Sequence, residues 1–476
     1  MVGGPCVEPV GWAWRRLSPS YIASTSHPTQ DALLPTSNRG MTTRMTPGGR
    51  LSAAIEILDT ILTHHRPAAD ALADWGKTHR FAGSGDRAAI GNVVYDALRK
   101  KLSTAARMGA DTSRALVLGS IGAAWGLNGE GVAAIVTGTA HDPAALTDKE
   151  SAALACPLAA ETPAHIRADM PDWLWPSFVA AFGEEGALAE GEAFKRRAPV
   201  DIRVNPLKSR REKVLKALEP FGAVATPFSP FGIRLAAAEG SGRTPNVQGE
   251  PGFQKGWFEI QDEGSQIAAL IAAAAAAPNS QVMDLCAGGG GKTLALSAAL
   301  ANKGQIFAYD SDRARLAPIH DRLKRAGARN VQVLQSRPAA LATYAGKMDC
   351  VVIDAPCTGT GVWRRRPEAK WKLRPEALER RITEQRALIS QAVGLLKSGG
   401  RLVYITCSLL PAENGEQVAW ALANHPGLAV APIGSLAITA LGESAATLAL
   451  DPAGGLTLRP SITHTDGFFV VVLTAP

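Results

Sequence analysis

Two cysteines directly follow apolar runs of the kind that form buried strands. Cys357 comes after the run 350–353, at the end of Asp354-Ala355-Pro356-Cys357, and Cys407 comes after the run 402–405, between Thr406 and Ser408. Cysteines that only pack in a core lie inside apolar runs, so the polar neighbours favour a reactive role for both thiols. The strands are expected to be neighbours in a parallel sheet, whose strand ends share one ligand-binding edge. We therefore predict that Cys357, Cys407 and Asp354 form one site.

A glycine-rich turn supplies a second candidate site. A short apolar run ending near Asp284 leads to Cys286-Ala287-Gly288-Gly289-Gly290-Gly291-Lys292 and then to an Ala- and Leu-rich segment, the pattern of strand, tight turn and helix. The P-loop pattern fails because its first glycine would fall on Cys286, and Gly-x-Gly-x-x-Gly fails at its last glycine. A turn that fits neither suits a ligand without a pyrophosphate, and S-adenosyl-L-methionine is the commonest. The alternative is a flexible crossover without a ligand, which four glycines make entropically costly.

Two thiols beside an S-adenosylmethionine site indicate one reaction. Carbon-5 of a pyrimidine is a poor nucleophile, but a thiolate that adds to carbon-6 turns the ring into an enamine whose carbon-5 can attack an activated methyl group. A base must then remove the carbon-5 proton before the thiolate leaves. Asp354 could bond the edge of the base and bias its protonation during addition. Methyl transfer to nitrogen or oxygen would need no cysteine.

Asp310 ends the apolar run 306–309. It lies about 20 residues after Gly290, the spacing at which an acid commonly accepts hydrogen bonds from ribose hydroxyls. We favour that role, although an N-cap at Ser311 or Asp312 is the alternative. Cys286 is expected to be a small packing residue.

A basic stretch with indoles follows the first thiol. It contains Trp363-Arg364-Arg365-Arg366, Lys370-Trp371-Lys372 and Arg374. Cations hold phosphates and rings stack on bases, so we predict that this stretch contacts a nucleic-acid strand rather than forming a merely solvated loop. The earlier basic run 99–101 is expected instead to be a solvated helix end.

The elements that must position these residues are an alternating series of strands and helices from Gln281 onward. This alternation predicts a doubly wound α/β sheet with ligands beyond the carboxyl ends of its strands. The expected strands are 282–285, 305–309, 331–334, 350–354, 401–405 and 468–473.

Length and composition predict several domains in 476 residues. We expect a disordered extension at 1–47, an all-α domain at 48–160, a linker and small α+β module at 161–262, and the sheet domain at 263–476. If Met41 or Met45 is the true start, most of the extension is not translated. The net charge of +7 suggests an anionic partner. The six cysteines form no Cys-x-x-Cys pair, and no stretch is long and apolar enough to span a membrane, so we expect no metal, no membrane and a reducing cytoplasm.

The sequence resembles the RsmB/NSUN-type RNA (cytosine-5)-methyltransferases from about Arg203 to Pro476. The resemblance rests on Arg203-Val204-Asn205, Gln261-Asp262, the loop 284–293, Asp354-Ala355-Pro356-Cys357, Thr406-Cys407-Ser408 with Glu413-Asn414, and Asp466-Gly467-Phe468-Phe469. The helical segment is similar to the NusB-like RNA-binding domain of the bacterial ribosomal RNA branch. The resemblance implies a Rossmann-like class I methyltransferase sheet after an all-α NusB-like domain and a small α+β module similar to RNA-recognition domains.

The resemblance also implies roles for individual residues. Cys407 would be the nucleophile, and Cys357 would assist release of the methylated product. The cofactor and the target base would be surrounded by Cys286, Ala287, Gly288, Gly289, Gly290, Gly291, Lys292, Asp310 and Asp354. The expected activity is methylation of small-subunit ribosomal RNA by a monomer, with S-adenosyl-L-methionine as cofactor.

Two departures from the family pattern leave alternatives open. Gly288 and Gly289 stand where Ala-Pro is usual, which predicts a looser loop and weaker cofactor binding. The usual acid after the third strand is missing from Leu334-Gln335-Ser336-Arg337, so Gln335 or Ser336 would have to bond adenine. These departures would permit a non-catalytic RNA-binding ribosome-assembly factor. A nucleotide-dependent enzyme that uses Gly291-Lys292-Thr293 is a further alternative.

Overall fold

The computed structural model describes residues 45–476, apart from the side chains of Ala123 and Ala124. Most of the extension predicted to be disordered, 1–44, lies outside the described residues.

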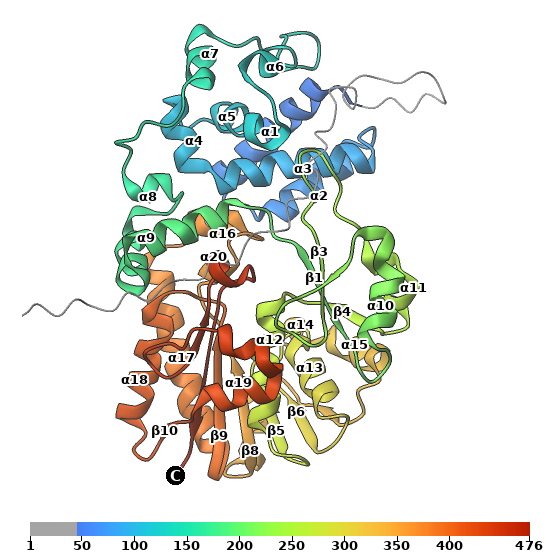
Figure 1. Cartoon of the computed structure of the whole chain (residues 1–476), viewed down its shortest axis with the longest axis vertical. Helices are drawn as coiled ribbons and strands as arrows, with labels where there is room; N and C mark the ends of the chain where they lie inside the picture. Colours follow the sequence, from blue (N-terminus) through green and yellow to red (C-terminus); the bar gives the residue numbers. More distant parts are fainter. Residues whose placement is uncertain (1–44) are drawn as a thin grey trace, which may run out of the picture. The chain divides into compact units, whose positions relative to one another are not determined.

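The N-terminal part of the described chain is all helical, as predicted (Figure 1). Its core is formed by apolar side chains at helical spacing, such as Leu51 and Leu58, which are fully buried with Val93 and Leu116. The Thr46 side chain caps the first helix by accepting a hydrogen bond from the Gly49 N–H at 2.9 Å. The helices are α1 (Pro47–His64), α2 (Ala68–Thr78), α3 (Ser84–Arg99), α4 (Lys101–Met108), α5 (Ser113–Trp125), α6 (Gly129–Ala133), α7 (Asp148–Ala155) and α8 (Ala164–Arg167).

A small antiparallel sheet follows the long helix α9 (Trp175–Lys195). Its strands are β1 (Val200–Val204), β2 (Val224–Ala225), β3 (Gly232–Leu235) and β4 (Phe258–Ile260), in the order β2-β3-β1-β4. The short helices α10 (Arg211–Leu218) and α11 (Pro251–Gln254) complete this module, with Val214 and Leu218 of α10 in its core. The region therefore forms a small α+β module, as expected.

The large sheet confirms the predicted doubly wound α/β fold. Its order is β10-β12-β9-β8-β5-β6-β7, with β11 paired to β12. The strands β7, β6, β5, β8 and β9 run parallel, and β12 is antiparallel to β9. The bounds are β5 (Gln281–Asp284), β6 (Gln305–Ala308), β7 (Val331–Val333), β8 (Met348–Asp354), β9 (Leu396–Thr406), β10 (Ala429–Val430), β11 (Leu456–Leu458) and β12 (Phe468–Thr474).

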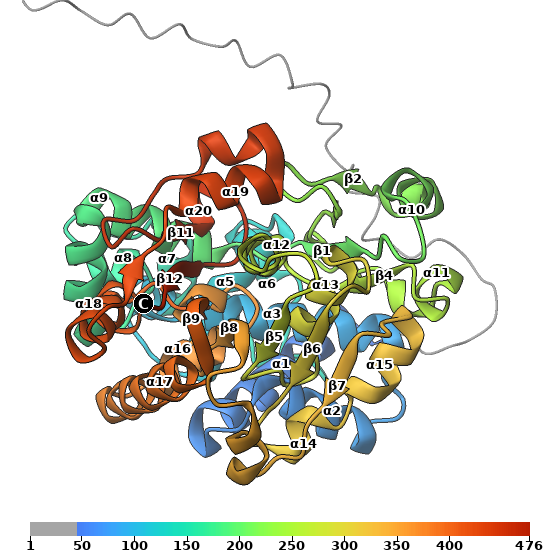
Figure 2. The same ribbon diagram turned by 90° about the horizontal axis from the view of Figure 1, so that it is seen from below.

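Helices cover both faces of this sheet, which is why its strands read as continuous apolar runs (Figure 2). Side chains from alternate positions of each strand enter opposite cores; Phe468 and Val470 pack with α12 (Glu263–Ala275) and α19 (Ile433–Leu441). Phe469 and Val471 pack on the other face, with α17 (Pro375–Leu395) and α18 (Gly415–Asn424). The crossover helices α13 (Gly291–Ala299), α14 (Arg313–Leu316) and α15 (Ile319–Ala326) link β5, β6 and β7.

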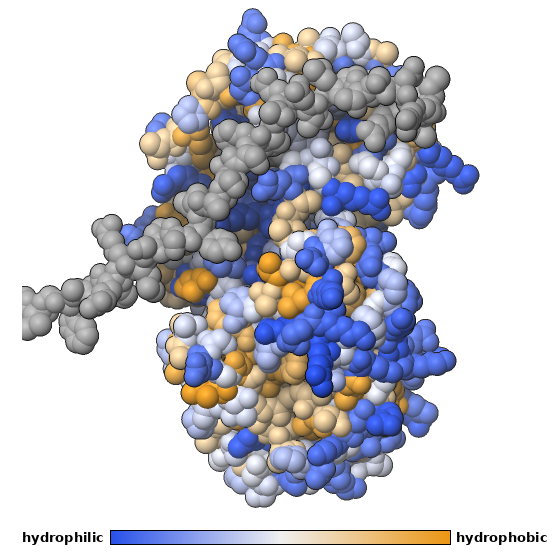
Figure 3. Space-filling view, turned by 45° about the vertical axis from the view of Figure 1, so that its right-hand side comes forward, coloured by the Kyte–Doolittle hydropathy of each residue, from blue (hydrophilic) through white to orange (hydrophobic). Residues whose placement is uncertain are grey.

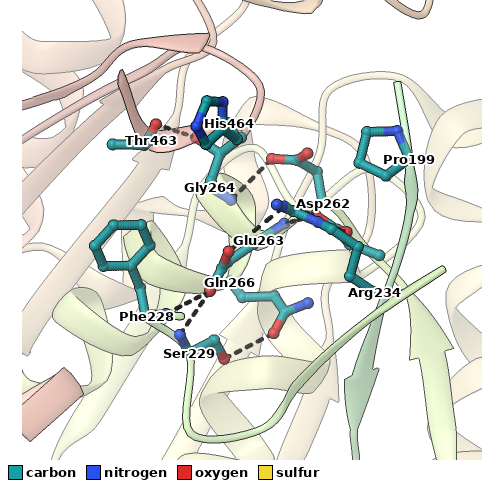
Figure 4. Close-up of polar contacts among 12 residues, drawn as sticks. Pro199, Phe228, Ser229, Arg234, Asp262, Glu263, Gly264, Gln266, Thr463 and His464 are labelled. Atoms are coloured by element: carbon teal, nitrogen blue, oxygen red, sulfur yellow. Dashed lines mark hydrogen bonds and ion pairs between the residues drawn. The ribbon is translucent and has the colours of Figure 1, made fainter. Parts of the chain in front are cut away.

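A buried polar joint fastens the small module to the start of α12. The Glu263 carboxylate is fully buried and accepts hydrogen bonds from the backbone N–H groups of Phe228 and Ser229, both at 2.8 Å (Figure 4). The Ser229 hydroxyl in turn bonds Gln266 at 2.8 Å. Because each of these contacts satisfies a buried polar group, the joint fixes the module beside the glycine loop that follows α12.

Candidate active site

The glycine loop lies between the end of β5 and the start of α13. Gly288 and Gly290 have φ values of +48° and +82°, in the left-handed region that glycine adopts without strain. A Cβ on Gly290 would lie 2.5 Å from Ile319 of α15, so only glycine fits there. A Cβ on Gly288 would meet no heavy atom closer than 3.6 Å. The main chain is therefore open at Gly288 and closed against the protein at Gly290.

Asp310 holds this loop from the end of the neighbouring strand. Its carboxylate is 2% exposed and accepts hydrogen bonds from the backbone N–H groups of Gly288 and Asp312, both at 2.9 Å. Asp312 is the N-cap of α14. Asp312 therefore has the capping role that was weighed as the alternative, whereas Asp310 bonds the glycine loop. Each Asp310 oxygen keeps a second lone pair, so a ribose contact is still chemically available.

Asp284, at the end of β5, is completely buried beneath the loop. Its Oδ2 accepts a hydrogen bond from the Thr293 hydroxyl at 2.6 Å, and its Oδ1 has no hydrogen-bond partner among the described residues. Burial is the largest cause of a rise in the pKa of Asp284 to about 7. Near pH 7 the Asp284 carboxyl is therefore divided between its protonated and ionised forms.

A pH-dependent stability follows from Asp284. A folded-state pKa near 7, above the usual 3.8, means that stability from proton binding is present at low pH and is lost as pH rises through 7. The free energy of unfolding of Asp284→Asn minus that of the wild type should therefore be more positive at pH 8 than at pH 6, by about 1 kcal/mol. Urea unfolding of both proteins at the two pH values measures this difference. An unchanged difference would show that Asp284 ionises normally in the fold.

Lys292 and Asp354 form an ion pair across the carboxyl edge of the sheet. Lys292 Nζ lies 2.7 Å from Asp354 Oδ2, with side-chain exposures of 7% and 36%. The ammonium group also lies 5.3 Å from the Phe468 ring. The lysine is thus committed to the acid at the end of β8 and is not free to cradle phosphates, which argues against the nucleotide-dependent alternative.

The two predicted thiols meet beside this ion pair. β8 and β9 pair in parallel with Asp354 opposite Ile405, which brings the turns that follow both strands together. The sulfur atoms of Cys357 and Cys407 lie 3.3 Å apart, and both side chains are half-buried. The pKa of Cys357 is raised well above its usual value, first by its hydrogen bond with Cys407 and then by burial. Cys286 packs against the core of the sheet, as expected for a packing residue, and burial raises the pKa of its thiol.

The residues around the loop fit S-adenosyl-L-methionine. The main chain is open at Gly288, where a ligand can approach closely: a Cβ there would lie 3.6 Å from the Arg315 guanidinium and 3.9 Å from the Asp310 carboxylate. Asp354 adds a second carboxylate at the end of β8. A Cβ on Gly291 would likewise meet no atom closer than 3.9 Å. Open backbone with flanking acids suits a ligand with ribose hydroxyls and a positive charge. Gln335 and Ser336, the two residues expected to bond adenine in place of the missing acid, follow β7. Gln335 is exposed and Ser336 is half-buried.

The predicted nucleic-acid contact of the basic stretch is wrong for most of its residues. Trp363 is 1% exposed and packs against Phe178 and Phe194 of α9, with ring centroids 5.8 and 5.2 Å away. Lys370 is also 1% exposed, and the Trp371 indole donates to the Leu98 carbonyl at 2.7 Å. These side chains therefore join the catalytic sheet to the helical segment.

The arginines of this stretch neutralise buried acids. Arg364 Nη2 lies 3.0 Å from Asp466, and Arg365 bonds both Asp466 at 2.5 Å and Asp262 at 2.9 Å. The expectation of a solvated helix end at 99–101 is also wrong for Arg99. Its guanidinium is buried and donates to the Arg364 carbonyl at 2.8 and 3.0 Å. Only Arg366 and Arg374 of the stretch are exposed.

Glu413 also lies beside the thiols, although the sequence assigned it no role beyond membership of the motif Glu413-Asn414. Its carboxylate is fully buried and accepts a hydrogen bond from the backbone N–H of Thr358, next to Cys357, at 2.8 Å. An acid that directly follows Pro411-Ala412 and precedes a helix gives no local sign of burial; the motif Glu413-Asn414 was the available signal.

Two classes of feature are absent from the described part of the chain. Within residues 45–476, no group of three or more His, Cys, Asp and Glu side chains is arranged to hold a metal ion. No helix in the same range is long and apolar enough to cross a membrane.

Comparison with known proteins matches two regions to one family. Residues 271–474 match the family described as 16S rRNA methyltransferase RsmB/F, and residues 170–240 match its ferredoxin-like domain. The probable ribosomal RNA small subunit methyltransferase B of Synechocystis sp. is 30% identical over 64% of this chain and 66% of its own length. Ribosomal RNA small subunit methyltransferase B of Sodalis glossinidius is 36% identical over 63% of this chain and 64% of its own. The alignments thus span just under two thirds of these relatives.

A solved structure extends the likeness over more of the chain. The crystal structure of PH0851 superposes with a TM-score of 0.67 at 25% identity, and the superposition covers 90% of this chain and 99% of the other. The likeness therefore includes more of the chain than the sheet domain alone.

Proposed function

We propose that this chain, which matches the RsmB/F methyltransferase family over residues 271–474 and its ferredoxin-like domain over residues 170–240, uses S-adenosyl-L-methionine to methylate carbon-5 of a cytosine in small-subunit ribosomal RNA. The observation that carries the proposal is the contact of Cys357 and Cys407, with sulfur atoms 3.3 Å apart at the carboxyl edge of the sheet. Methyl transfer to nitrogen or oxygen would use neither thiol, whereas transfer to carbon-5 uses a sulfur nucleophile.

Each residue at this edge has a distinct part in the proposal. Cys407 adds to carbon-6 of the base, which makes carbon-5 electron-rich, and Asp354 bonds the edge of the base during addition. S-adenosyl-L-methionine, when bound, supplies an electrophilic methyl group. Once carbon-5 carries its new substituent, its proton leaves to a base, the carbon-6–sulfur bond breaks, and Cys357 assists release. Lys292 keeps the Asp354 carboxylate oriented through their 2.7 Å contact.

The RNA strand needs a cationic surface, and the small module supplies one. Lys213 and Lys255 are exposed and lie over the Trp257 indole, with their ammonium groups 4.0 and 5.5 Å from the ring centroid. Arg325 of α15 lies over the neighbouring Phe253 ring at 4.2 Å, and its guanidinium pairs with Glu259. Lys208 rests against Gly327, at the end of the same helix. We call the three lysines Lys208, Lys213 and Lys255, together with Trp257, the basic surface of the module.

This basic surface lies beside the glycine loop. Arg322 of α15 donates to the Gly289 carbonyl at 2.5 Å and pairs with Glu259 of β4 at 3.0 Å. The helix α15, whose C-terminal end lies against Lys208 of this surface, therefore also supports the loop. In Figure 3, hydrophilic side chains gather on the face that carries α10 and α11. Cations around an indole suit phosphates and unstacked bases, so this surface replaces the basic stretch at 363–374 as the predicted RNA contact.

Methyl transfer to unmodified small-subunit ribosomal RNA tests the proposed function. With S-adenosyl-L-methionine labelled in its methyl group, the label should be recovered as 5-methylcytidine after digestion to nucleosides, and bisulfite sequencing should locate it at one cytosine. Label in any other nucleoside would contradict the carbon-5 chemistry. Cofactor binding in calorimetry without transfer to RNA would favour an RNA-binding assembly factor.

A charge-matched pair of variants tests the RNA surface in the same assay. Lys213→Ala/Lys255→Ala should weaken RNA binding about tenfold and reduce the slope of log affinity against log salt by about 1.5. Lys303→Ala/Lys397→Ala, at the amino edge of the sheet, removes the same charge and should leave RNA affinity nearly unchanged. Equal effects of the two variants would show that the cations act only through net charge.

A further inference from the structure

Two consecutive residues each hold the neighbours of one cysteine. Glu413 ends the 3-10 turn Pro411–Glu413, and Asn414 precedes α18; both are buried, with exposures of 0% and 5%. Neither residue belongs to the strands or turns that carry the thiols. Their side chains nevertheless reach both of those turns.

Glu413 fixes the turn that carries Cys357. One carboxylate oxygen accepts hydrogen bonds from the Thr358 N–H at 2.8 Å and from Gln385 Nε2 at 3.1 Å, and the other bonds the Thr358 hydroxyl. The same Gln385 amide donates to the Pro356 carbonyl at 3.0 Å. The residues before and after Cys357 are therefore both held by this acid and its glutamine partner.

Asn414 fixes the turn that carries Cys407 in the same manner. Its Oδ1 accepts a hydrogen bond from the Thr406 hydroxyl at 2.6 Å, and its Nδ2 donates to the Ser408 carbonyl at 2.9 Å. Thr406 and Ser408 are the two neighbours of Cys407. The Tyr404 hydroxyl anchors the backbone between the two clamps by donating to the Glu413 carbonyl at 2.7 Å.

The two clamps are alike in geometry but differ in charge. The clamp on Cys357 is a carboxylate that accepts hydrogen bonds on both oxygens, whereas the clamp on Cys407 is a neutral amide. A negative charge close to a thiol disfavours its thiolate form, and this effect is strong in a buried site. The negative charge of Glu413 is among the causes that raise the pKa of Cys357, after its hydrogen bond with Cys407 and burial.

We propose that Glu413 and Asn414 are positioning residues that assign different roles to the two thiols: the charged clamp disfavours the thiolate form of Cys357, whereas the neutral clamp adds no charge beside Cys407, the attacking thiol. This inference refines the proposed function, since it explains why one of two touching sulfur atoms attacks the base. It concerns the free protein, so it can be tested without RNA or cofactor.

The test is the pH profile of alkylation at each cysteine. Pre-reduced full-length protein is treated with iodoacetamide, and peptide mass spectrometry gives separate rates for Cys357, Cys407 and the exposed Cys156, which serves as the internal reference. Glu413→Gln keeps the shape of the clamp and removes its charge. Alkylation of Cys357 relative to Cys156 should then rise about tenfold near pH 8, because removal of the negative charge lowers the pKa of Cys357 and so raises its thiolate fraction. An unchanged relative rate would overturn the inference.

The reciprocal variant keeps the test decisive if Glu413→Gln does not fold. Asn414→Asp places the charge on the other clamp and should slow alkylation of Cys407 relative to Cys156, and an unchanged rate would also overturn the inference. A third variant, Thr358→Val, removes one hydrogen bond of the clamp but no charge, and should leave the alkylation profile of Cys357 in place. If the protein methylates carbon-5 of cytosine but neither charge change alters the alkylation profiles, only this inference is refuted. If the profiles change as expected but RNA is not methylated, only the proposed function is refuted.

Discussion

Replacement of Cys407 by alanine is expected to lower methyl transfer to RNA by at least about a thousandfold. The physical reason is that carbon-5 of cytosine gains nucleophilic character only after a sulfur atom has added to carbon-6, and the neighbouring Cys357 is held in its protonated form. Rates measured with labelled cofactor under single-turnover conditions give the loss directly. The variant should still bind cofactor, because neither the hydrogen bond between Gly288 and Asp310 nor the Lys292–Asp354 ion pair involves the Cys407 side chain.

Two controls separate this chemistry from loss of structure. Cys156→Ala removes an exposed thiol far from the sheet edge and should leave the rate unchanged. Cys407→Ser keeps the polarity of the side chain but supplies a much weaker nucleophile, so it should be nearly as inactive as Cys407→Ala. Full activity of Cys407→Ala would refute the role assigned to this cysteine.

Replacement of Cys357 by alanine is expected to have the opposite signature: a covalent protein–RNA complex that accumulates. In the proposed scheme Cys407 still adds to carbon-6, but release of the methylated base lacks the assistance of Cys357, so the sulfur–carbon bond persists. A band of reduced mobility on a denaturing gel, which ribonuclease removes, measures the adduct. It should require both RNA and cofactor and should appear within the first turnover.

The double variant Cys357→Ala/Cys407→Ala is the matched control for the trapped complex. It lacks the attacking sulfur and should form no adduct under the same conditions. If Cys357→Ala also forms no adduct and continues to turn over, Cys357 has no part in release. Its 3.3 Å contact with Cys407 would then be only a packing contact.

The strands and the glycine loop were predictable because their physical requirements are local. A parallel strand that is buried on both faces must be apolar along its whole length, and the six expected strands are all present near their predicted bounds. Positive φ angles at Gly288 and Gly290 explain why glycine marks the turn. The short strands β10 and β11, of two and three residues, were not predicted, since such segments carry too little pattern to recognise.

The basic stretch at 363–374 was misassigned because sequence reports charge but not exposure. The counterions of Arg365 are Asp262 and Asp466, which lie 103 and 101 residues away in the chain. Nothing near Arg365 in the sequence indicates that two buried carboxylates surround it. Conversely, Lys213, Lys255 and Arg325 are scattered in sequence, and only the fold gathers them near Trp257 and Phe253.

The same limit applies to the residues that hold the thiols. The positions of Cys357 and Cys407 at strand ends are local facts, so their meeting at one edge could be expected from a parallel sheet. The partners of Glu413 are Thr358 and Gln385, which lie 55 and 28 residues before it. Its role as a clamp therefore depends on the packing of α17 and α18 against the sheet, which no local pattern around Glu413 specifies.

The central claim is that the sulfur of Cys407 bonds to carbon-6 of a cytosine in RNA. The measurement that tests it most directly is peptide mass spectrometry of the complex trapped by Cys357→Ala, after digestion with trypsin and ribonuclease. The peptide containing Cys407 should carry the added mass of a 5-methylcytidine nucleotide. A nucleotide attached to any other residue would contradict this role of Cys407. So would methylated RNA recovered together with a Cys407 peptide that carries no nucleotide.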